Sequence, residues 1–320
     1  MRRCVQIATG LRGRGIESLF YLPNEPNSIT FIKNAGVPYQ LATPEYGIEQ
    51  LLSSLNNTRV VVLDLLHADK EYTGRIRKTL AAIKILGLDY FDMHDDQIDV
   101  IINLYNHSPD AEKPFNSNVK YKEGPEWGII RNDFLKYTGL EKSYDEPVKK
   151  VLVTFGGADP RKHTLAVITV LAELVLEITI IIGPNFHHEE DIRKLVKQII
   201  PLAKIYKNPA DLALLMFESG VCICGSGTTI LESAAMGTPT IIIPQSTEEL
   251  GFASVFENAG FAMIAGTPTN IDNGKIRDFF FQLNSQTGMA RKIGMTGRGL
   301  CDGKGAEKII REITYLLESE

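Results

Sequence analysis

The residues best suited to bind or transform a ligand lie in one stretch, residues 220–237. An apolar run at 220–224 predicts a short buried strand, a turn of small residues follows it, and Gly237 ends the helical pattern that comes next. The turn, called the Ser226 turn below, consists of Gly225, Ser226, Gly227, Thr228 and Thr229. Small residues let the backbone approach a ligand, and the first amides of a helix lack internal partners and carry the positive end of its dipole. The stretch is therefore typical of an anion site, most simply a phosphate site.

Glu232 lies four residues after Thr228, so the two side chains share one face of the expected helix. A carboxylate beside a diphosphate would be repelled, unless it accepted hydrogen bonds from neutral hydroxyls such as those of a ribose. An anion site with a hydroxyl acceptor one turn away suits a nucleoside diphosphate. Small-residue turns and acidic side chains near helix starts also occur without any ligand, because the helix dipole alone favours them.

Composition excludes several other classes of protein. The chain has 320 residues, enough for one large or two medium domains, and its 34 basic and 39 acidic residues leave a net charge of −5. This balance gives no indication of a nucleic-acid partner or a membrane-surface partner. The four cysteines lack the spacing of a zinc site and indicate a reducing compartment. The pair His187-His188, followed by two glutamates, is interpreted as a solvated helix start rather than a metal site.

No signal peptide is recognisable at the N-terminus. The longest apolar stretch, residues 165–182, is interrupted by Glu173 and Glu177, so it predicts a helix followed by a buried strand rather than a membrane span. We therefore expect a cytoplasmic protein without membrane insertion.

The N-terminal half alternates short apolar runs with helical patterns. Strands are expected at 18–22, 60–63, 88–91 and 99–102. Runs that are apolar on both faces are typical of a parallel sheet covered by helices. Residues 1–11 predict a helix that precedes the first strand, whereas a doubly wound domain normally begins with a strand. The N-terminal domain is therefore expected to lack its first strand.

A polar segment, residues 134–150, predicts a linker, and a second alternating series follows it. Strands are expected at 151–155, 178–182, 203–206, 220–224, 240–243 and 261–264, and helices at 209–217, at 250–259 and from about residues 163 and 189. A final helix is expected at 306–317. The predicted fold class is α/β, with two doubly wound Rossmann-like domains, 1–145 and 146–320, facing a cleft. Gly156 and Gly157 follow the strand at 151–155, so they are expected to approach the same ligand as the Ser226 turn.

Five sequence segments occur in an order that resembles a known family. They are RCVQIA at 3–8, GPEW at 124–127 with RNDF at 131–134, VTFGGADP at 153–160, residues 225–237, and DGKGA at 302–306. Together they resemble the UDP-sugar hydrolases of pseudaminic acid biosynthesis and the related spore-coat polysaccharide biosynthesis proteins of the G type. The resemblance covers nearly the whole chain.

The resemblance implies a GT-B-like fold and hydrolysis of UDP-2,4-diacetamido-2,4,6-trideoxy-beta-L-altropyranose to UDP and the free sugar, without a metal or cofactor. It implies that Glu232 binds the ribose and that residues 226–229 bind the diphosphate. The implied partners are a UDP-sugar and enzymes of a surface-sugar pathway.

The chain departs from the family pattern in two places. The family's general-base histidine, in a Gly-x-Gly-His turn after a first strand, would fall just before Met1. Where the family has an Asn-Gln pair that reaches the sugar, alignment through Ala253 places Glu248 and Glu249. Carboxylates there are expected to alter or weaken substrate binding, because like charges repel in a partly dry site.

Candidates for the missing catalytic group are His67 and Asp64, which follow the strand expected at 60–63. An ordinary hydrogen-bonded loop histidine, or a carboxylate that caps a helix, is the competing interpretation of each. Arg131 is a candidate either for anchoring its segment or for contacting the sugar.

Three hypotheses stay open from the sequence. The first is a UDP-sugar hydrolase, the second a UDP-dependent glycosyltransferase with a sugar hydroxyl as acceptor. The third is a non-catalytic UDP-sugar-binding homologue that has lost the general base.

Overall fold

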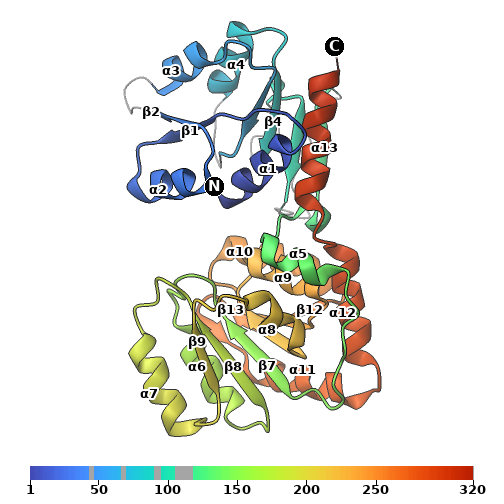
Figure 1. Cartoon of the computed structure of the whole chain (residues 1–320). Helices are drawn as coiled ribbons and strands as arrows, with labels where there is room; N and C mark the ends of the chain where they lie inside the picture. Colours follow the sequence, from blue (N-terminus) through green and yellow to red (C-terminus); the bar gives the residue numbers. More distant parts are fainter. Residues whose placement is uncertain (43–46, 66–69, 90–94, 105–117, 320) are drawn as a thin grey trace. The chain divides into compact units, whose positions relative to one another are not determined.

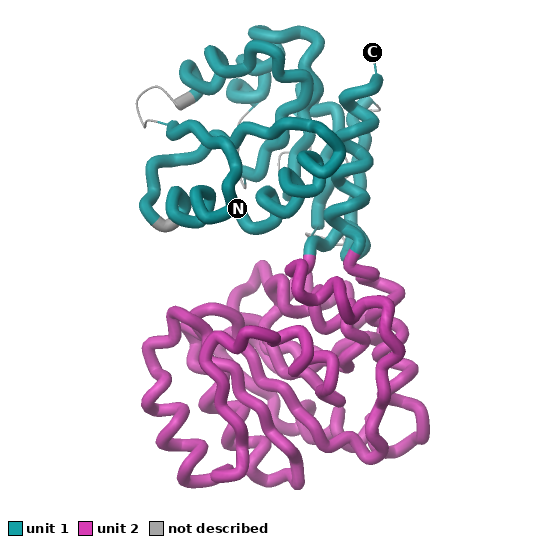
Figure 2. Tube along the Cα trace, in the orientation of Figure 1, with its two compact units in different colours: residues 1–105, 110–129, 304–320 teal, residues 106–109, 130–303 magenta. Residues whose placement is uncertain are grey.

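Figure 1 shows a computed structural model of the chain, which describes all residues except 43–46, 66–69, 90–94, 105–117 and 320. The chain forms two compact units, coloured separately in Figure 2. Unit 1 combines residues 1–105, 110–129 and 304–320, and unit 2 contains residues 106–109 and 130–303. The chain thus leaves unit 1, completes unit 2, and returns to unit 1 with its last helix.

This division differs from the expected one between residues 145 and 146. The segment interpreted as a linker begins with helix α5 (Asn132–Thr138), which packs on two helices of unit 2. Tyr137 of α5 stacks on Phe217, with ring centroids 5.3 Å apart. Burial of this aromatic surface makes the segment part of unit 2 rather than a linker.

Unit 1 contains a four-stranded parallel sheet in the order β3-β4-β5-β6 and a separate parallel pair, β1-β2. The strands are β1 (Phe20–Pro23), β2 (Tyr39–Ala42), β3 (Val60–Leu63), β4 (Lys84–Leu88), β5 (Val100–Asn103) and β6 (Lys120–Glu123). The helices are α1 (Arg2–Arg12), α2 (Pro26–Ala35), α3 (Gly47–Ser54), α4 (Lys70–Thr79), the short η1 (Pro125–Trp127) and α13 (Gly305–Glu318).

Apolar side chains alternate between the two faces of the sheet of unit 1, and helices cover both faces. Leu86 and Leu88 pack with residues of α1 and α13, including Ile7 and Ile309. Ile85, between them, belongs to the core cluster on the other face, with residues of α3 and α4. Successive side chains of a strand point to opposite faces, so each apolar run supplies both layers.

The first helix precedes the first strand, as expected: α1 spans Arg2–Arg12 and leads toward β1. Among the described residues, β1 pairs only with β2 and β3 pairs only with β4, so each has one open edge. The strand expected at 88–91 begins too late, because β4 occupies Lys84–Leu88; residues 90 and 91 lie outside the described residues. Asp89 interrupts the apolar residues directly after Leu88, and β4 takes the part before it, which pairs with β3.

Unit 2 is a six-stranded parallel sheet in the order β12-β11-β10-β7-β8-β9. Its strands are β7 (Lys150–Thr154), β8 (Glu177–Ile182), β9 (Lys204–Lys207), β10 (Val221–Cys224), β11 (Thr240–Ile242) and β12 (Ala262–Ile264). Every strand predicted for this half has its counterpart here. The order reverses between β7 and β10, which makes the carboxyl ends of these two strands the topological switch point of the sheet.

The helices of unit 2 are α5, α6 (His163–Leu171), α7 (Glu189–Ile199), α8 (Leu212–Glu218), α9 (Thr228–Met236), α10 (Thr247–Asn258), α11 (Asn273–Ser285) and α12 (Met289–Leu300). A short hairpin, β13 (Gly266–Thr267) and β14 (Asn270–Ile271), lies between β12 and α11. The sequence did not indicate α11 or α12. The stretch 165–182 divides into α6 and β8, and no described helix has the length and apolar character needed to cross a membrane.

Glycine on α12 allows this helix to pack closely on its neighbours. A Cβ at Gly297 would lie 2.4 Å from the ring of Phe261 and 3.1 Å from the Cα of Ala234 in α9. Gly299, in the same helix, has no atom within 4 Å of its Cβ position. Substituting alanine at each of the two positions therefore distinguishes the effect of close packing from that of intrinsic helix propensity.

We predict that Gly297→Ala lowers the free energy of unfolding by about 1–3 kcal/mol, because a methyl group there overpacks the contact with Phe261. Gly299→Ala is the matched control and should raise it by up to about 1 kcal/mol, since alanine is the better helix former. Urea unfolding of the two variants checks this. A Gly297→Ala protein as stable as the control would show that the α9–α12 contact is loose.

Candidate functional site

Two loops begin side by side at the switch point of unit 2. Cys224 at the end of β10 pairs in register with Thr154 at the end of β7, so the residues after both strands leave the sheet at one edge. Gly156 in the β7 loop has a φ of 69°, a left-handed conformation that favours glycine. A Cβ on Gly183, which follows β8, would lie 2.2 Å from the carbonyl oxygen of Gly156. The absence of a side chain at 183 thus lets the loop of β7 pack directly on the end of β8.

The Ser226 turn has the form that the sequence predicts. Helix α9 begins at Thr228, and its N-cap residue, Gly227, supplies no side-chain acceptor to the first amides. Ser226 is buried, whereas Thr228 is exposed. The amino end of α9 therefore presents backbone donors and the positive end of its dipole beside an accessible side chain, an arrangement that attracts anions.

Glu249 from α10 reaches into this turn. Its Oε2 accepts hydrogen bonds from the backbone amide of Gln245 at 2.8 Å and from the amide and hydroxyl of Ser226, each at 3.3 Å. The single proton of the Ser226 hydroxyl is shared between this oxygen and the Glu249 carbonyl oxygen, which is the nearer acceptor at 2.8 Å. Gln245, which the sequence did not single out, donates from Nε2 to the Phe155 carbonyl at 3.4 Å and so links the β11 loop to the β7 loop. The sequence signal that could have identified Gln245 is its position just after the strand expected at 240–243.

Glu248, the other carboxylate predicted to reach the sugar, lies elsewhere. Its side chain is exposed and accepts a hydrogen bond from Ser246, which holds the pKa of that carboxyl below its ordinary value. Adjacent residues of a helix point in different directions, so only one of this pair can face the turn.

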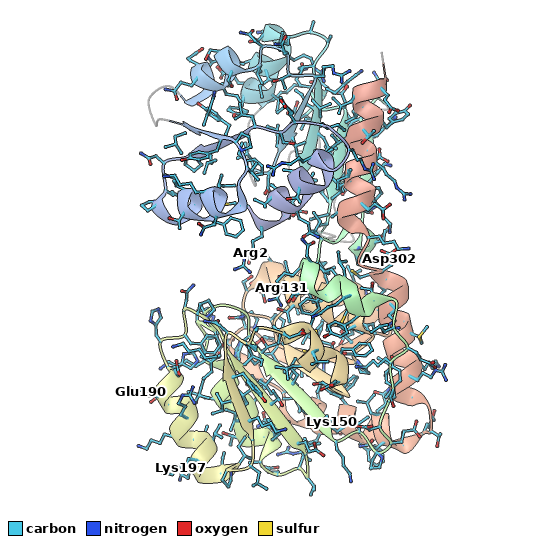
Figure 3. All side chains as sticks on the ribbon, in the orientation of Figure 1. Arg2, Arg131, Lys150, Glu190, Lys197 and Asp302 are labelled. Carbon is cyan, nitrogen blue, oxygen red and sulfur yellow. The ribbon has the colours of Figure 1, made fainter. Side chains whose placement is uncertain are left out.

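Glu232 is paired with Arg131 rather than exposed to solvent. The guanidinium donates from Nε to Oε1 at 2.6 Å and from Nη2 to Oε2 at 3.0 Å, and Glu232 is only 2% exposed. Burial raises the pKa of Glu232, although the charge and hydrogen bonds of Arg131 oppose the increase. Arg131 lies at the start of α5 (Figure 3), with its guanidinium 4.7 Å from the ring centroid of Phe134. The bidentate pair fixes the orientation of this carboxylate and leaves it further lone pairs for a hydroxyl donor.

A second buried carboxylate fixes the loop after β7. Asp159 accepts hydrogen bonds from the backbone amides of His163 and Thr164, at 2.9 and 3.0 Å, at the start of α6. His188 Nε2 lies 3.2 Å from Oδ2 of this carboxylate, the oxygen that also accepts the Thr164 amide. Interpreting His188 as part of a solvated helix start is therefore wrong: it is buried and stacks on Phe186, with centroids 5.0 Å apart.

In unit 1, Asp64 follows β3 and is held by the first helix. It accepts hydrogen bonds from Arg3, at 3.1 Å from Nε, and from the thiol of Cys4 at 2.8 Å. Arg3 also pairs with Asp89, a buried residue after β4 that accepts the amide of Leu104 at 2.8 Å. Burial alone would raise the pKa of Asp64, but the hydrogen bonds and charge of Arg3 reverse the effect and lower it.

A carboxylate held ionised in this way is a weak general base, so the structure favours a positioning role for Asp64. The other catalytic candidate, His67, lies outside the described residues. No group of three His, Cys, Asp or Glu side chains in the described part of the chain could hold a metal ion.

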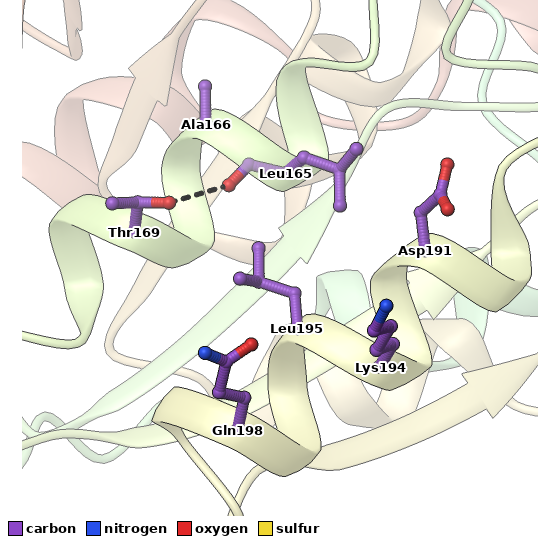
Figure 4. Close-up of a pocket in the computed structure, with 7 residues that line it drawn as sticks. All are labelled: Leu165, Ala166, Thr169, Asp191, Lys194, Leu195 and Gln198. Atoms are coloured by element: carbon purple, nitrogen blue, oxygen red, sulfur yellow. Dashed lines mark hydrogen bonds between the residues drawn. The ribbon is translucent and has the colours of Figure 1, made fainter.

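A surface groove between α6 and α7 lies apart from these residues (Figure 4). It is lined by Leu165, Ala166, Thr169, Asp191, Lys194, Leu195 and Gln198. Its lining contains none of the predicted ligand-binding residues. The structure thus brings together Gly225, Ser226, Glu249 and the loop of Gly156 and Gly157, and it pairs Glu232 with Arg131.

Comparison with known proteins gives two relatives in sequence, and no family model matches the chain. An uncharacterized protein of Methanocaldococcus jannaschii is 26% identical over 257 residues, which cover 76% of this chain and 52% of that protein. A Helicobacter pylori protein is 25% identical over 271 residues, covering 81% of this chain and 44% of that protein. It is described as pseudaminic acid cytidylyltransferase and UDP-2,4-diacetamido-2,4,6-trideoxy-beta-L-altropyranose hydrolase. The chain spans about half the length of the curated relatives it matches.

Solved structures share the fold over nearly the whole chain. MurG of Acinetobacter baumannii superposes with a TM-score of 0.72 at 13% identity, covering 98% of this chain and 95% of that one. HepE of Anabaena, in complex with UDP, gives a TM-score of 0.61 at 13% identity, with coverage of 98% and 95%. The protein therefore has the GT-B fold, α/β with two Rossmann-like units, as the sequence predicted.

We predict that Arg131→Ala lowers the free energy of unfolding by about 3 kcal/mol at neutral pH, because Glu232 would keep a buried charge without its cation. Without the guanidinium the folded-state pKa of Glu232 rises further above its unfolded value. The loss is then largest above that pKa and shrinks at mildly acidic pH, as the carboxyl is protonated in the folded state.

Urea unfolding at the two pH values measures both effects. The double variant Arg131→Met with Glu232→Gln is the control, since a neutral pair of similar volume should recover most of the loss. A loss that does not depend on pH would show that Arg131 stabilises α5 through packing alone.

Proposed function

We propose that the protein is a UDP-sugar hydrolase that releases UDP and a free amino-deoxy sugar in pseudaminic acid or related surface polysaccharide biosynthesis. The observation that carries the proposal is the convergence of two glycine-bearing loops at the switch point between β7 and β10, where helix α9 begins. Open α/β sheets bind nucleotides at this point. The sequence relationship to the bifunctional Helicobacter pylori protein supports the choice of a UDP-sugar and of hydrolysis.

In the proposed binding mode, the diphosphate contacts the Ser226 turn and the loop of Gly156 and Gly157. Backbone amides serve this purpose because they donate to phosphate oxygens and their dipoles are already oriented. Glu232 would accept from the ribose hydroxyls, with Arg131 holding the carboxylate in place. Glycines in both loops allow the backbone to approach the diphosphate closely.

The reaction would transfer the sugar's anomeric carbon from the phosphate oxygen to a water oxygen, with a general base removing the water proton. Asp64 is a poor candidate for this base, because its carboxylate is engaged by Arg3 and Cys4. We assign Asp64 the role of organising the carboxyl ends of β3 and β4. Activation of water is assigned to another group, for which His67 remains the candidate by position.

Two other functions are favoured by particular observations. The shared fold with glycosyltransferases such as MurG favours transfer to a sugar hydroxyl instead of water. The engagement of Asp64 favours a UDP-sugar-binding homologue without turnover. The transferase and the non-catalytic homologue both retain the proposed nucleotide site, so UDP binding is expected for all three functions. The products formed distinguish the three.

Calorimetry with UDP tests the nucleotide site, and product analysis with the named UDP-sugar tests the reaction. UDP and free sugar without an acceptor would support hydrolysis, whereas release only with an added sugar acceptor would indicate a transferase. Binding without turnover would indicate the non-catalytic homologue. If the wild-type protein had no measurable affinity for UDP, the nucleotide site itself would be wrongly assigned.

We predict that Thr228→Asp weakens UDP binding at least about tenfold, because a carboxylate on the first residue of α9 repels the diphosphate. The same change should raise the free energy of unfolding by about 0.3–1 kcal/mol, since an acidic side chain favours a helix amino end. Thr228→Asn is the matched neutral control and should keep most of the UDP affinity. Weaker binding together with lower stability would point to misfolding instead of charge repulsion.

A further inference from the structure

Glu249 takes up donors that an anionic ligand of the Ser226 turn would use. Its Oε2 accepts from the amide of Ser226 at 3.3 Å, from the Ser226 hydroxyl at 3.3 Å and from the amide of Gln245 at 2.8 Å. Backbone amides that converge on one carboxylate oxygen present the same donors that bind a phosphate oxygen. The side chain therefore supplies an anion of its own to the turn.

Gly225 at the end of β10 lies beside this carboxylate. A Cβ at this position would lie 3.5 Å from Glu249 Oε2, an ordinary contact distance, and 3.1 Å from Gln245 Nε2, a tighter one. The end of β10, the Gln245 side chain and the Glu249 carboxylate thus lie next to one another. The contact is therefore built from three segments of unit 2 rather than from one flexible side chain.

The charge of Glu249 is not neutralised in the same way as that of Glu232. In the described part of the chain, the hydrogen-bond donors to Glu249 are two amides and one hydroxyl, none of which carries a charge. Glu232, by contrast, has the guanidinium of Arg131. Both carboxylates raise the pKa of the buried Cys224 thiol at the end of β10, after the larger effects of its hydrogen bond with Cys222 and of burial. The carboxylate of Glu249 therefore adds negative charge to the edge of the sheet next to the turn.

Cap formation on α10 does not need the charge of Glu249. Ser246 is the N-cap residue, and its hydroxyl accepts the amide of Glu249 at 3.3 Å. The bond from the Gln245 amide to the Glu249 side chain requires only a neutral acceptor, which a glutamine would also provide. The negative charge at position 249 is therefore separable from the local structure that the side chain supports.

We propose that Glu249 is an internal competitor for the diphosphate, which must displace its carboxylate from the Ser226 amide in order to bind. This inference rests on the proposed function, because it takes UDP as the ligand of the turn. Glu249 then sets how tightly anionic ligands are held there. The terminal phosphate of UDP is no longer esterified by the sugar, so it carries more negative charge than the same phosphate in a UDP-sugar. The Glu249 carboxylate therefore weakens the retention of UDP and favours release of this product.

The test compares the UDP affinity of the wild-type protein with that of Glu249→Gln by calorimetry. The variant keeps a neutral acceptor for the amides of Ser226 and Gln245 and removes the competing charge. We expect its UDP dissociation constant to fall at least about tenfold, because the variant no longer places a like charge near the diphosphate.

Glu248→Gln is the matched control, because it removes the same charge from the preceding residue, whose side chain is exposed and bonded to Ser246. Its UDP affinity should change less than about twofold, since water and salt screen an exposed charge. Equal gains in the two variants would overturn the inference, because a general charge effect would then explain both.

Glu249→Ala is the second variant, to be used if the glutamine variant does not fold. It also removes the competing charge and should show the same gain in UDP affinity. Unchanged or weaker UDP binding by a folded position-249 variant, beside a wild-type protein that binds, would overturn the inference alone and make Glu249 a support of the turn. Absence of UDP binding by the wild-type protein and the position-249 variants would overturn the proposed nucleotide site, and this inference with it.

Discussion

Parallel pairing of β7 with β10 is the constraint on which the candidate site depends. Cys224 lies opposite Thr154 in this ladder, so the loop of Gly156 and the Ser226 turn leave the sheet at the same level. A shift of one residue would exchange the two buried faces of these short strands and misplace the side chains packed against each layer, which disfavours other registers. The positions of the two loops therefore follow from the burial of the core beneath them.

The polar groups around this edge are arranged by burial and pairing. Asp159 and Glu232 are both almost fully enclosed, and each is compensated by hydrogen-bond donors. Asp159 receives two helix amides and an imidazole, so it joins the β7 loop to the loop after β8. Glu232 receives a guanidinium from α5. Buried carboxylates held by several donors make rigid supports, whereas the donors that the described residues supply to the partly exposed Glu249 are all neutral.

Much of the fold could be predicted from the sequence, because parallel strands that are buried on both faces are continuous apolar runs. Residues 151–155 and 220–224 are of this kind, and both strands are found close to the predicted positions. The strand after residue 83 was placed too late, since apolar side chains occur on both sides of Asp89, and the part before it is the one that pairs with β3. The boundary of the units was missed because α5 is short and polar, and its aromatic contact with Phe217 has no local signal.

The site could be predicted as far as local geometry determines it. The start of α9 and the small residues before it are visible in the sequence, so the position of the Ser226 turn was predicted. The pairing of Arg131 with Glu232 spans 101 residues, and the reach of Glu249 to Ser226 spans 23. Contacts at such separations depend on how α5 and α10 pack, which residue spacing along one helix cannot reveal. His188 was misjudged for the same reason, since its carboxylate partner lies 29 residues earlier.

The position of α13 in the core of unit 1 has a consequence for synthesis on the ribosome. Ile309 and Ile313 fill the same cluster as Leu86 and Ile102, although unit 2 is translated between them. One face of the unit 1 core therefore stays open until α13 has been synthesised, while unit 2, whose sheet is continuous in sequence, can fold earlier. In this order of synthesis, unit 1 begins before unit 2 and is completed after it.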